Sequence, residues 1–202
     1  MGDQLIISIS REFGAGGAHV AKKLAEEYGI SLYDSNILEQ MSNELDFDPK
    51  HYEEYDEKPR NYLLSKRVGR YVSSAEEITA RAQFKYLRER ADAGESFVVV
   101  GRVSDYVLRY KDCLVTIFIT GKEDKKIDFL MKEHHISAKK ARDMMVKMDR
   151  RRRTYHNSYA DTKWGDSRYY DMCIDVTNVG IDAAAGIIKQ YVDGIIAAKK
   201  SN

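Results

Sequence analysis

The fold of this 202-residue chain is decided by one stretch near its start, Leu5-Ile6-Ile7-Ser8-Ile9-Ser10-Arg11-Glu12-Phe13-Gly14-Ala15-Gly16-Gly17-Ala18-His19-Val20. Its first part, Leu5 to Ile9, is a short β-branched apolar run with the length of a buried strand. The glycines that follow allow a tight turn. Apolar residues at i, i+4 spacing after the turn, Val20 and Leu24, predict a helix. The stretch therefore predicts a strand, a glycine-rich turn and a helix in succession.

Such a turn is suited to binding an anion, because its backbone N–H groups can point inward and the next helix begins beside it. We expect a phosphate to contact Gly14, Ala15, Gly16, Gly17, Ala18 and His19. The nucleotide-loop pattern G-x-x-x-x-G-K-[ST] also requires a lysine for the phosphates and a hydroxyl for Mg²⁺. Aligned on Gly16, this chain has Arg11 at the first glycine, Gly17 at the lysine and Ala18 at the hydroxyl. An ordinary strand–turn–helix connection remains the alternative.

Composition indicates one soluble globular domain. Hydrophobic residues make up 43% of the chain and charged residues 32%, and the net charge of +1 argues against bulk nucleic-acid binding. No apolar run approaches the roughly 20 residues of a membrane helix, and the N-terminus lacks a signal-peptide pattern, so a cytoplasmic location is expected. Cys113 and Cys173 lie in apolar runs and are expected to be buried rather than to bind metal. The sequence leaves a homo-oligomer open.

Strand-like and helix-like segments alternate along the rest of the chain. Strands are predicted at residues 31–34, 96–100, 113–120 and 172–176, and helices at 36–45, 76–93, 105–109, 123–134, 137–153 and 180–198. This alternation predicts a single α/β domain built on a five-stranded, mostly parallel sheet flanked by helices. Ligands of such sheets bind beyond the carboxyl ends of the strands. The residues at those predicted ends are Ser10, Arg11, Asp34, Gly101, Arg102 and Gly121.

Charged residues supply candidates for phosphate chemistry. The densest cluster is Lys147-Met148-Asp149-Arg150-Arg151-Arg152-Arg153. Consecutive arginines cover all faces of a helix, so some must point inward or toward a ligand, where a guanidinium can bind phosphate oxygens in pairs. A solvated basic helix end is the alternative. Asp34 and Asp105 are candidates to orient an acceptor and Arg102 to hold its phosphate, while each could instead form a surface ion pair. Trp164 is expected to pack its own loop.

Together these segments resemble the cytidylate kinase-like family, a branch of the nucleoside monophosphate kinases, over nearly the whole chain. The resemblance is carried by the opening loop from Ile7 to Gly17, by Leu32-Tyr33-Asp34, by Val99-Val100-Gly101-Arg102, by the run from Asp149 to Arg153 and by the stretch from Ile174 to Asp182. It implies a P-loop NTPase-type kinase core in one domain over residues 1–202. A helical acceptor-binding insert over 35–93 and an arginine-rich lid over 149–165 are part of that expectation.

The resemblance also implies ATP and Mg²⁺, with a nucleoside monophosphate as acceptor and CMP or dCMP as the first expectation. In this reading Arg11 supplies the charge of the missing lysine, and the lid arginines Arg150 and Arg153 close over the transferring group. Arg102, Asp34 and Asp105 would position the acceptor. Ser10 and Glu12 would approach the metal.

Two other functions remain open because the loop lacks its lysine. A non-catalytic nucleotide-binding sensor or partner-binding module is favoured by Gly17 and Ala18 and opposed by the retained lid arginines. A kinase of another small acceptor is favoured by residues 46–70, which do not resemble the base-reading segment of cytidylate kinases. Neither a membrane nor a nucleic acid is expected as a partner.

Overall fold

Five strands form the central sheet of the computed structural model, which describes residues 4–44, 67–68, 71–72 and 75–200. They are β1 (Ile6–Arg11), β2 (Ser31–Tyr33), β5 (Phe97–Val100), β6 (Leu114–Thr120) and β7 (Met172–Asp175). Their order is β2-β5-β1-β6-β7, and each neighbouring pair is parallel. The predicted five-stranded α/β sheet is confirmed, and it is parallel throughout.

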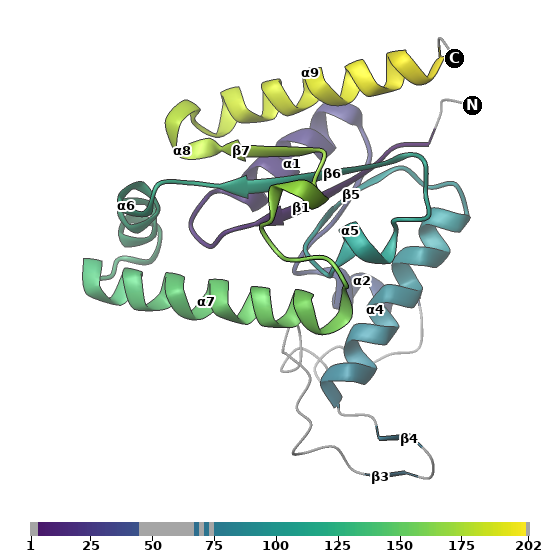
Figure 1. The fold of residues 1–202 in the computed structure, drawn as a ribbon, viewed down its shortest axis with the longest axis horizontal. Coiled ribbons are helices and arrows are strands. Elements are labelled where there is room, and N and C mark those ends of the chain that lie inside the picture. The colour runs from purple at the N-terminus through teal and green to yellow at the C-terminus, as the bar shows by residue number, and fades with distance from the viewer. Residues whose placement is uncertain (1–3, 45–66, 69–70, 73–74, 201–202) are drawn as a thin grey trace.

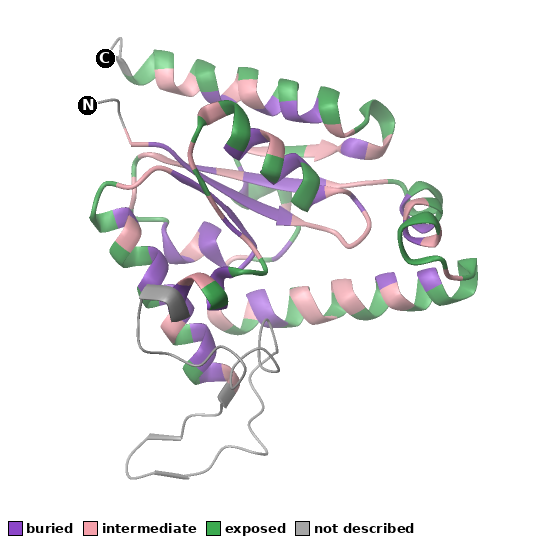
Figure 2. Ribbon diagram, turned by 180° about the vertical axis from the view of Figure 1, so that it is seen from behind, coloured by how far each residue is buried: buried purple, intermediate pink, exposed green. Residues whose placement is uncertain are grey.

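Helices cover both faces of this sheet (Figure 1). Because strand residues alternate between faces, Ile7 and Ile9 pack with α1 (Gly17–Tyr28) and α9 (Ile181–Lys200). On the other face lie α2 (Ile37–Glu44), α4 (Ala75–Asp92), α5 (Ser104–Val107) and the end of α7 (Ala138–Tyr159). Figure 2 shows that burial is concentrated in the strands and on the inward sides of these helices. Within the described residues, none of the helices is both long and apolar enough to span a membrane.

Smaller elements complete the fold. Helix α6 (Glu123–His134) precedes α7 and packs against it, with Ile127 and Leu130 facing Ala141 and Met145. The others are the hairpin of β3 (Arg67–Val68) and β4 (Tyr71–Val72), the 3-10 helix η1 (Ser167–Tyr169) and α8 (Val176–Val179). Trp164 packs against Phe118 and Tyr170, as expected for a residue that orders its own loop. The predicted insert over 35–93 falls partly outside the described residues.

Three predicted boundaries were wrong. Strand β1 continues through Arg11, which pairs with Ile119 of β6, so Arg11 belongs to the strand and not to the turn. Helix α7 runs six residues past the predicted end at Arg153, because Tyr155 is buried against the sheet and holds the next turn of helix in place. Val176 begins α8 rather than ending β7, because Asp175 Oδ1 accepts a hydrogen bond from Thr177 N–H at 2.9 Å and caps a helix there.

The expected burial of the two cysteines was also wrong. Cys113 precedes β6 and is only partly buried, and its thiol donates to Gln4 Oε1 at 3.3 Å. Cys173 is exposed, because it lies on β7, which is the edge strand of the sheet among the described residues.

Candidate active site

The loop between β1 and α1 takes its shape from two glycines with positive φ. Gly14 has φ 82° and Gly16 has φ 77°, a region that residues with side chains rarely adopt. Helix α1 begins directly afterwards at Gly17, and no side chain among the described residues caps it. The first amides of a helix have no partner within the helix, so they can bind an anion. This is the backbone geometry that the predicted phosphate loop requires.

Arg11 and Gly17, the two residues that depart most from the nucleotide-loop pattern, lie against each other. A Cβ atom added to Gly17 would be 2.6 Å from Arg11 Cβ and 2.9 Å from Arg11 Cγ. Packed side chains do not approach so closely, since carbon atoms prefer separations of about 3.5–4.0 Å. Glycine at position 17 is therefore the partner that the Arg11 side chain requires.

Two hollows meet at Arg11. The first, here called the loop pocket, lies over the glycine-rich turn and is lined by Arg11, Gly14, Gly16, Gly17, His19 and Arg152, among others. The second, here called the arginine cleft, is lined by Ser10, Arg11, Arg102, Arg152, Tyr155 and His156, among others. Arg11 and Arg152 contribute to both. Positive charge is thus concentrated where the loop pocket and the arginine cleft join.

The turn after β5 brings Arg102 to the cleft through an unusual backbone. Gly101, Arg102 and Val103 have φ of 75°, 58° and 55°, so two residues with side chains follow a glycine in the left-handed region. A β-branched residue there is a genuine outlier, and such strain costs on the order of 1–3 kcal/mol per residue. Val103 is buried, and Ser104 Oγ lies 2.6 Å from Ser8 Oγ, so packing and a hydrogen bond hold the turn.

Arg102 also connects the ends of two strands. Its Nη2 donates to the backbone oxygen of Asp34 at 3.2 Å, directly beyond β2. The Asp34 carboxylate itself accepts from Asn36 N–H at 3.0 Å. The structure therefore brings together two of the predicted acceptor-binding residues, with the guanidinium of Arg102 lining the cleft.

Helix α7 lies across the loop and is joined to it at two points. Asp149 Oδ1 accepts from Phe13 N–H at 2.6 Å, and burial raises the pKa of this carboxyl group. Arg152 donates to the backbone oxygen of Arg11 at 3.4 Å, and its guanidinium lies 5.3 Å from the centre of the Phe13 ring. Helix α7 is therefore held against the loop pocket.

The inward arginine of this helix is one that sequence reasoning missed. Arg150 and Arg153 are exposed, and Arg153 lies over the Trp164 ring at 5.5 Å. Arg152 instead faces the loop, together with Asp149 and His156. The usable signal was the spacing Met145, Asp149, Arg152 and His156, which lies on one face of a helix once Met145 is known to be buried.

Asp105 and His156 form a buried pair beside the cleft. His156 Nε2 lies 2.8 Å from Asp105 Oδ2, and both side chains are at least nine-tenths buried. His156 lines the arginine cleft, whereas Asp105 lines a separate cavity with Arg109 and Lys111. Asp105 thus contacts His156, a residue the sequence did not single out, and its contact with an acceptor stays a prediction.

The residues expected to bind metal do not fit a magnesium site in this arrangement. Glu12 Oε2 accepts from Thr120 Oγ1 at 2.7 Å, from Gly121 N–H at 3.3 Å and from the Lys126 ammonium at 2.7 Å. A buried ammonium at that distance opposes a divalent cation by charge. Ser10 is buried. Among the described residues there is no group of three or more histidines, cysteines or carboxylates placed to hold a metal ion.

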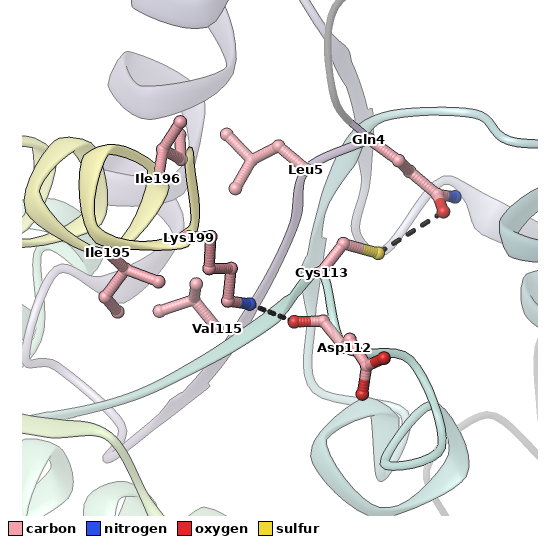
Figure 3. Close-up of a pocket in the computed structure, with 8 residues that line it drawn as sticks. All are labelled: Gln4, Leu5, Asp112, Cys113, Val115, Ile195, Ile196 and Lys199. Atoms are coloured by element: carbon pink, nitrogen blue, oxygen red, sulfur yellow. Dashed lines mark hydrogen bonds between the residues drawn. The ribbon is translucent and has the colours of Figure 1, made fainter. Parts of the chain in front are cut away.

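Two further cavities lie at opposite ends of the strands. One of about 250 Å³ adjoins the loop at Gly14 and Gly16 and has apolar walls from Phe129, Val176 and Ile181. The other, of about 410 Å³, lies at the amino edge of the sheet between Leu5, Val115 and Ile196 (Figure 3). It is at the opposite end of the strands from Ser10 and Arg102, so we do not assign the active site to it.

Comparison with known proteins identifies the family. The model of the cytidylate kinase-like family matches residues 6–178. The chain is 23% identical over 193 residues to the cytidylate kinase of Pyrococcus horikoshii, covering 95% of this chain and 90% of that protein.

Solved structures agree on the fold. An uncharacterized protein from Eubacterium ventriosum is 37% identical, with a TM-score of 0.74 over 94% of this chain and 99% of that chain. A shikimate kinase from Bacteroides thetaiotaomicron has a TM-score of 0.56 at 11% identity, over 94% of this chain and 98% of that chain, and shows likeness of fold alone. The fold is that of P-loop kinases, and the chain belongs to the cytidylate kinase-like family.

Proposed function

We propose that this chain is an ATP-dependent phosphotransferase that acts on a nucleoside monophosphate, with CMP or dCMP as the first candidates. The observation that carries the proposal is the contact between Arg11 and Gly17. In the nucleotide-loop pattern a glycine ends the strand and a lysine begins the helix. Here the cation ends the strand and the glycine begins the helix, so the two residue types have exchanged places across one contact.

This exchange keeps a positive charge beside the phosphates. Arg11 lines both the loop pocket and the arginine cleft, so this residue lies at the junction where a phosphoryl group would pass from donor to acceptor. Phosphoryl transfer depends on positioning and on neutralising charge, with little covalent chemistry from the protein. The absence of lysine at position 17 is therefore compatible with catalysis.

The positive charge on the acceptor side suits an anionic group. Arg11, Arg102 and Arg152 line one narrow cleft, and a guanidinium can bind two phosphate oxygens at once. We assign Arg102 to the acceptor phosphate and Arg152 to the transferring group. Asp34 lies where it can orient the acceptor through the Arg102 contact.

The donor side fits a nucleoside triphosphate. The amides from Gly14 to His19 would hold its phosphates, and the apolar walls of Phe129 and Ile181 would enclose its base. Mg²⁺ would enter with ATP as part of the substrate, held by phosphate oxygens and water. The lid over 149–165 would close further on the bound donor, which would bring the exposed Arg150 and Arg153 nearer, and the segment over 35–93 would cover the acceptor.

A coupled ADP-release assay with Mg-ATP against a panel of nucleoside monophosphates tests the proposal, beside ATP binding by calorimetry. Turnover with CMP or dCMP is the expected result. Turnover only with a nucleoside monophosphate other than CMP or dCMP would keep the kinase and correct its substrate.

The second candidate function is a nucleotide-binding sensor without turnover. Gly17 and Ala18 favour it, since neither supplies the lysine or the hydroxyl of the nucleotide-loop pattern. ATP binding without turnover on any acceptor would support the sensor. No ATP binding at all would contradict both functions.

A further inference from the structure

The buried pair of His156 and Asp105 has no part in the proposed phosphoryl transfer, although His156 lines the arginine cleft. Burying two ionisable groups is costly unless each is paired, so their placement needs a reason. The pair joins α5 to the C-terminal end of α7, elements that are distant in sequence and lie side by side in Figure 1.

Both nitrogens of the imidazole are engaged. Asn157 Oδ1 accepts from Trp164 N–H at 3.0 Å, so the oxygen of this amide, not its nitrogen, faces His156 Nδ1 at 3.3 Å. Nδ1 therefore carries a hydrogen, while Nε2 is bound to the Asp105 carboxyl group at 2.8 Å. Neither nitrogen offers a lone pair to the cleft, so His156 does not serve as a general base in this arrangement.

The pair instead connects two arginines of the cleft, Arg102 and Arg152. Asp105 lies three residues after Arg102, and His156 lies one helical turn after Arg152. The turn that carries Arg102 has φ of 58° and 55° at Arg102 and Val103, so it relaxes unless its surroundings hold it. The pair ties this turn to helix α7.

We propose that His156 is a positioning residue: through Asp105 it sets the separation of Arg102 and Arg152 and thereby the affinity of the cleft for the anionic group of the acceptor. The identity of that acceptor rests on the proposed function, but binding of an anion by the cleft does not.

Four variants separate positioning from mere stability. His156→Gln keeps a donor for Asp105, whereas His156→Met fills a similar volume without one. The double variant Asp105→Leu/His156→Met removes both polar groups, and such apolar replacement of a buried pair is often neutral for stability. Tyr106→Phe is the matched control, because Tyr106 Oη donates to Asp161 at 2.6 Å and also joins α5 to the segment after α7, outside the arginine cleft.

The measurement is calorimetric titration of inorganic phosphate, with Arg102→Ala marking the binding that belongs to the cleft. We expect His156→Met and the double variant to lose about tenfold or more in this affinity, the range of one charge-assisted hydrogen bond. His156→Gln and Tyr106→Phe should stay within about twofold of the unmodified protein. The melting temperature of the double variant should be close to that of the unmodified protein.

Three results would overturn the proposal: a folded double variant that binds phosphate like the unmodified protein, a loss in Tyr106→Phe as large as in His156→Met, or equal binding by the unmodified protein and Arg102→Ala. Where turnover is found, the variants that lose phosphate affinity should raise the acceptor KM by a larger factor than the ATP KM. Absence of turnover with intact differences in phosphate affinity would reject the proposed function alone.

Discussion

The turns that follow the neighbouring strands β1 and β5 lie at the same edge of the sheet but use different residues at positive φ. The loop after β1 has a glycine at each positive φ, at Gly14 and Gly16. The turn after β5 has one glycine and then two residues with side chains, Arg102 and Val103, at positive φ. In the proposed function the first turn binds an anion through backbone amides, which need no side chain. The second would present the guanidinium of Arg102, which glycine lacks, so this role would explain why the strain at Arg102 and Val103 is retained.

The two turns also differ in what holds them. The loop is held by α7, through contacts of Asp149 with Phe13 and of Arg152 with Arg11. The strained turn is held from within, by the buried Val103 and by the contact between Ser8 and Ser104. A loop without strain can be held by side chains of a helix that packs over it, whereas a strained turn needs restraints in the core.

The largest effect should come from exchanging the cation and the glycine of the loop. Arg11→Gly should lower kcat about 10³-fold, the range for losing one preorganised group that stabilises the transition state. Gly17→Lys should be similarly inactive, because its Cβ would lie 2.6 Å from Arg11 Cβ. The double variant Arg11→Gly/Gly17→Lys rebuilds the first glycine and the lysine of the nucleotide-loop pattern and should recover much of the activity, since the two sites are in contact and are not additive.

Steady-state kinetics of the three variants check this exchange. Lys22→Ala is the control, because Lys22 is an exposed cation of α1 with only an exposed partner, Glu26, at 3.9 Å. A double variant less active than either single variant would show that Arg11 does not take the place of the lysine.

A smaller, two-part effect is expected at the strained turn. Arg102→Ala and Arg102→Gly both remove the guanidinium, so each should raise the acceptor KM roughly 10- to 100-fold with the ATP KM unchanged. Only glycine relieves the positive φ, so Arg102→Gly should be more stable than Arg102→Ala by about 1 kcal/mol in urea unfolding. Gly16→Ala should instead lower the free energy of unfolding by about 1 kcal/mol, because Gly16 has φ 77°.

Kinetics and unfolding of the two Arg102 variants sharpen the contrast between the turns. If Arg102→Ala proved as stable as Arg102→Gly, the turn after β5 would carry no strain, and the contrast with the glycine loop would fail.

Much of this architecture followed from local patterns. Short apolar runs and helical periodicity predicted the five strands and most helices, because each element buries one face. The residues at the strand ends were predicted because parallel strands present their carboxyl ends at one edge. Arg102 was found in this way, and the structure places it in the arginine cleft.

The missed features depend on contacts across the chain. The packing of α7 decides which of its arginines points inward, and Arg152 could not be told apart within a run of four arginines. His156 lay beyond the predicted end of that helix. The helix continues past this end because Tyr155 is buried. The exchange between Arg11 and Gly17 could be aligned in the sequence, but the contact that explains it exists only in three dimensions.

The smallest effect concerns the carboxyl group of Asp149, which contacts the loop at Phe13. Burial raises the pKa of Asp149 in the folded protein, so the folded state binds this proton more tightly than the unfolded state does. Stability should therefore fall as pH rises from the unfolded pKa, near 3.8, through the raised folded value. Asp149→Asn keeps an oxygen that can accept from Phe13 N–H but does not titrate, so its stability advantage over the unmodified protein should grow over that interval and then level off.

Urea unfolding at a series of pH values measures this difference. Asp166→Asn is the control of opposite sign, because Arg168 lowers the pKa of Asp166 to about 2, and the unmodified protein should lose that contribution as pH falls. If the difference in free energy of unfolding between Asp149→Asn and the unmodified protein did not change with pH, the Asp149 carboxylate would be solvated despite its contact with Phe13. The glycine loop would then be held no more firmly than a surface turn, and its contrast with the restrained turn after β5 would become larger.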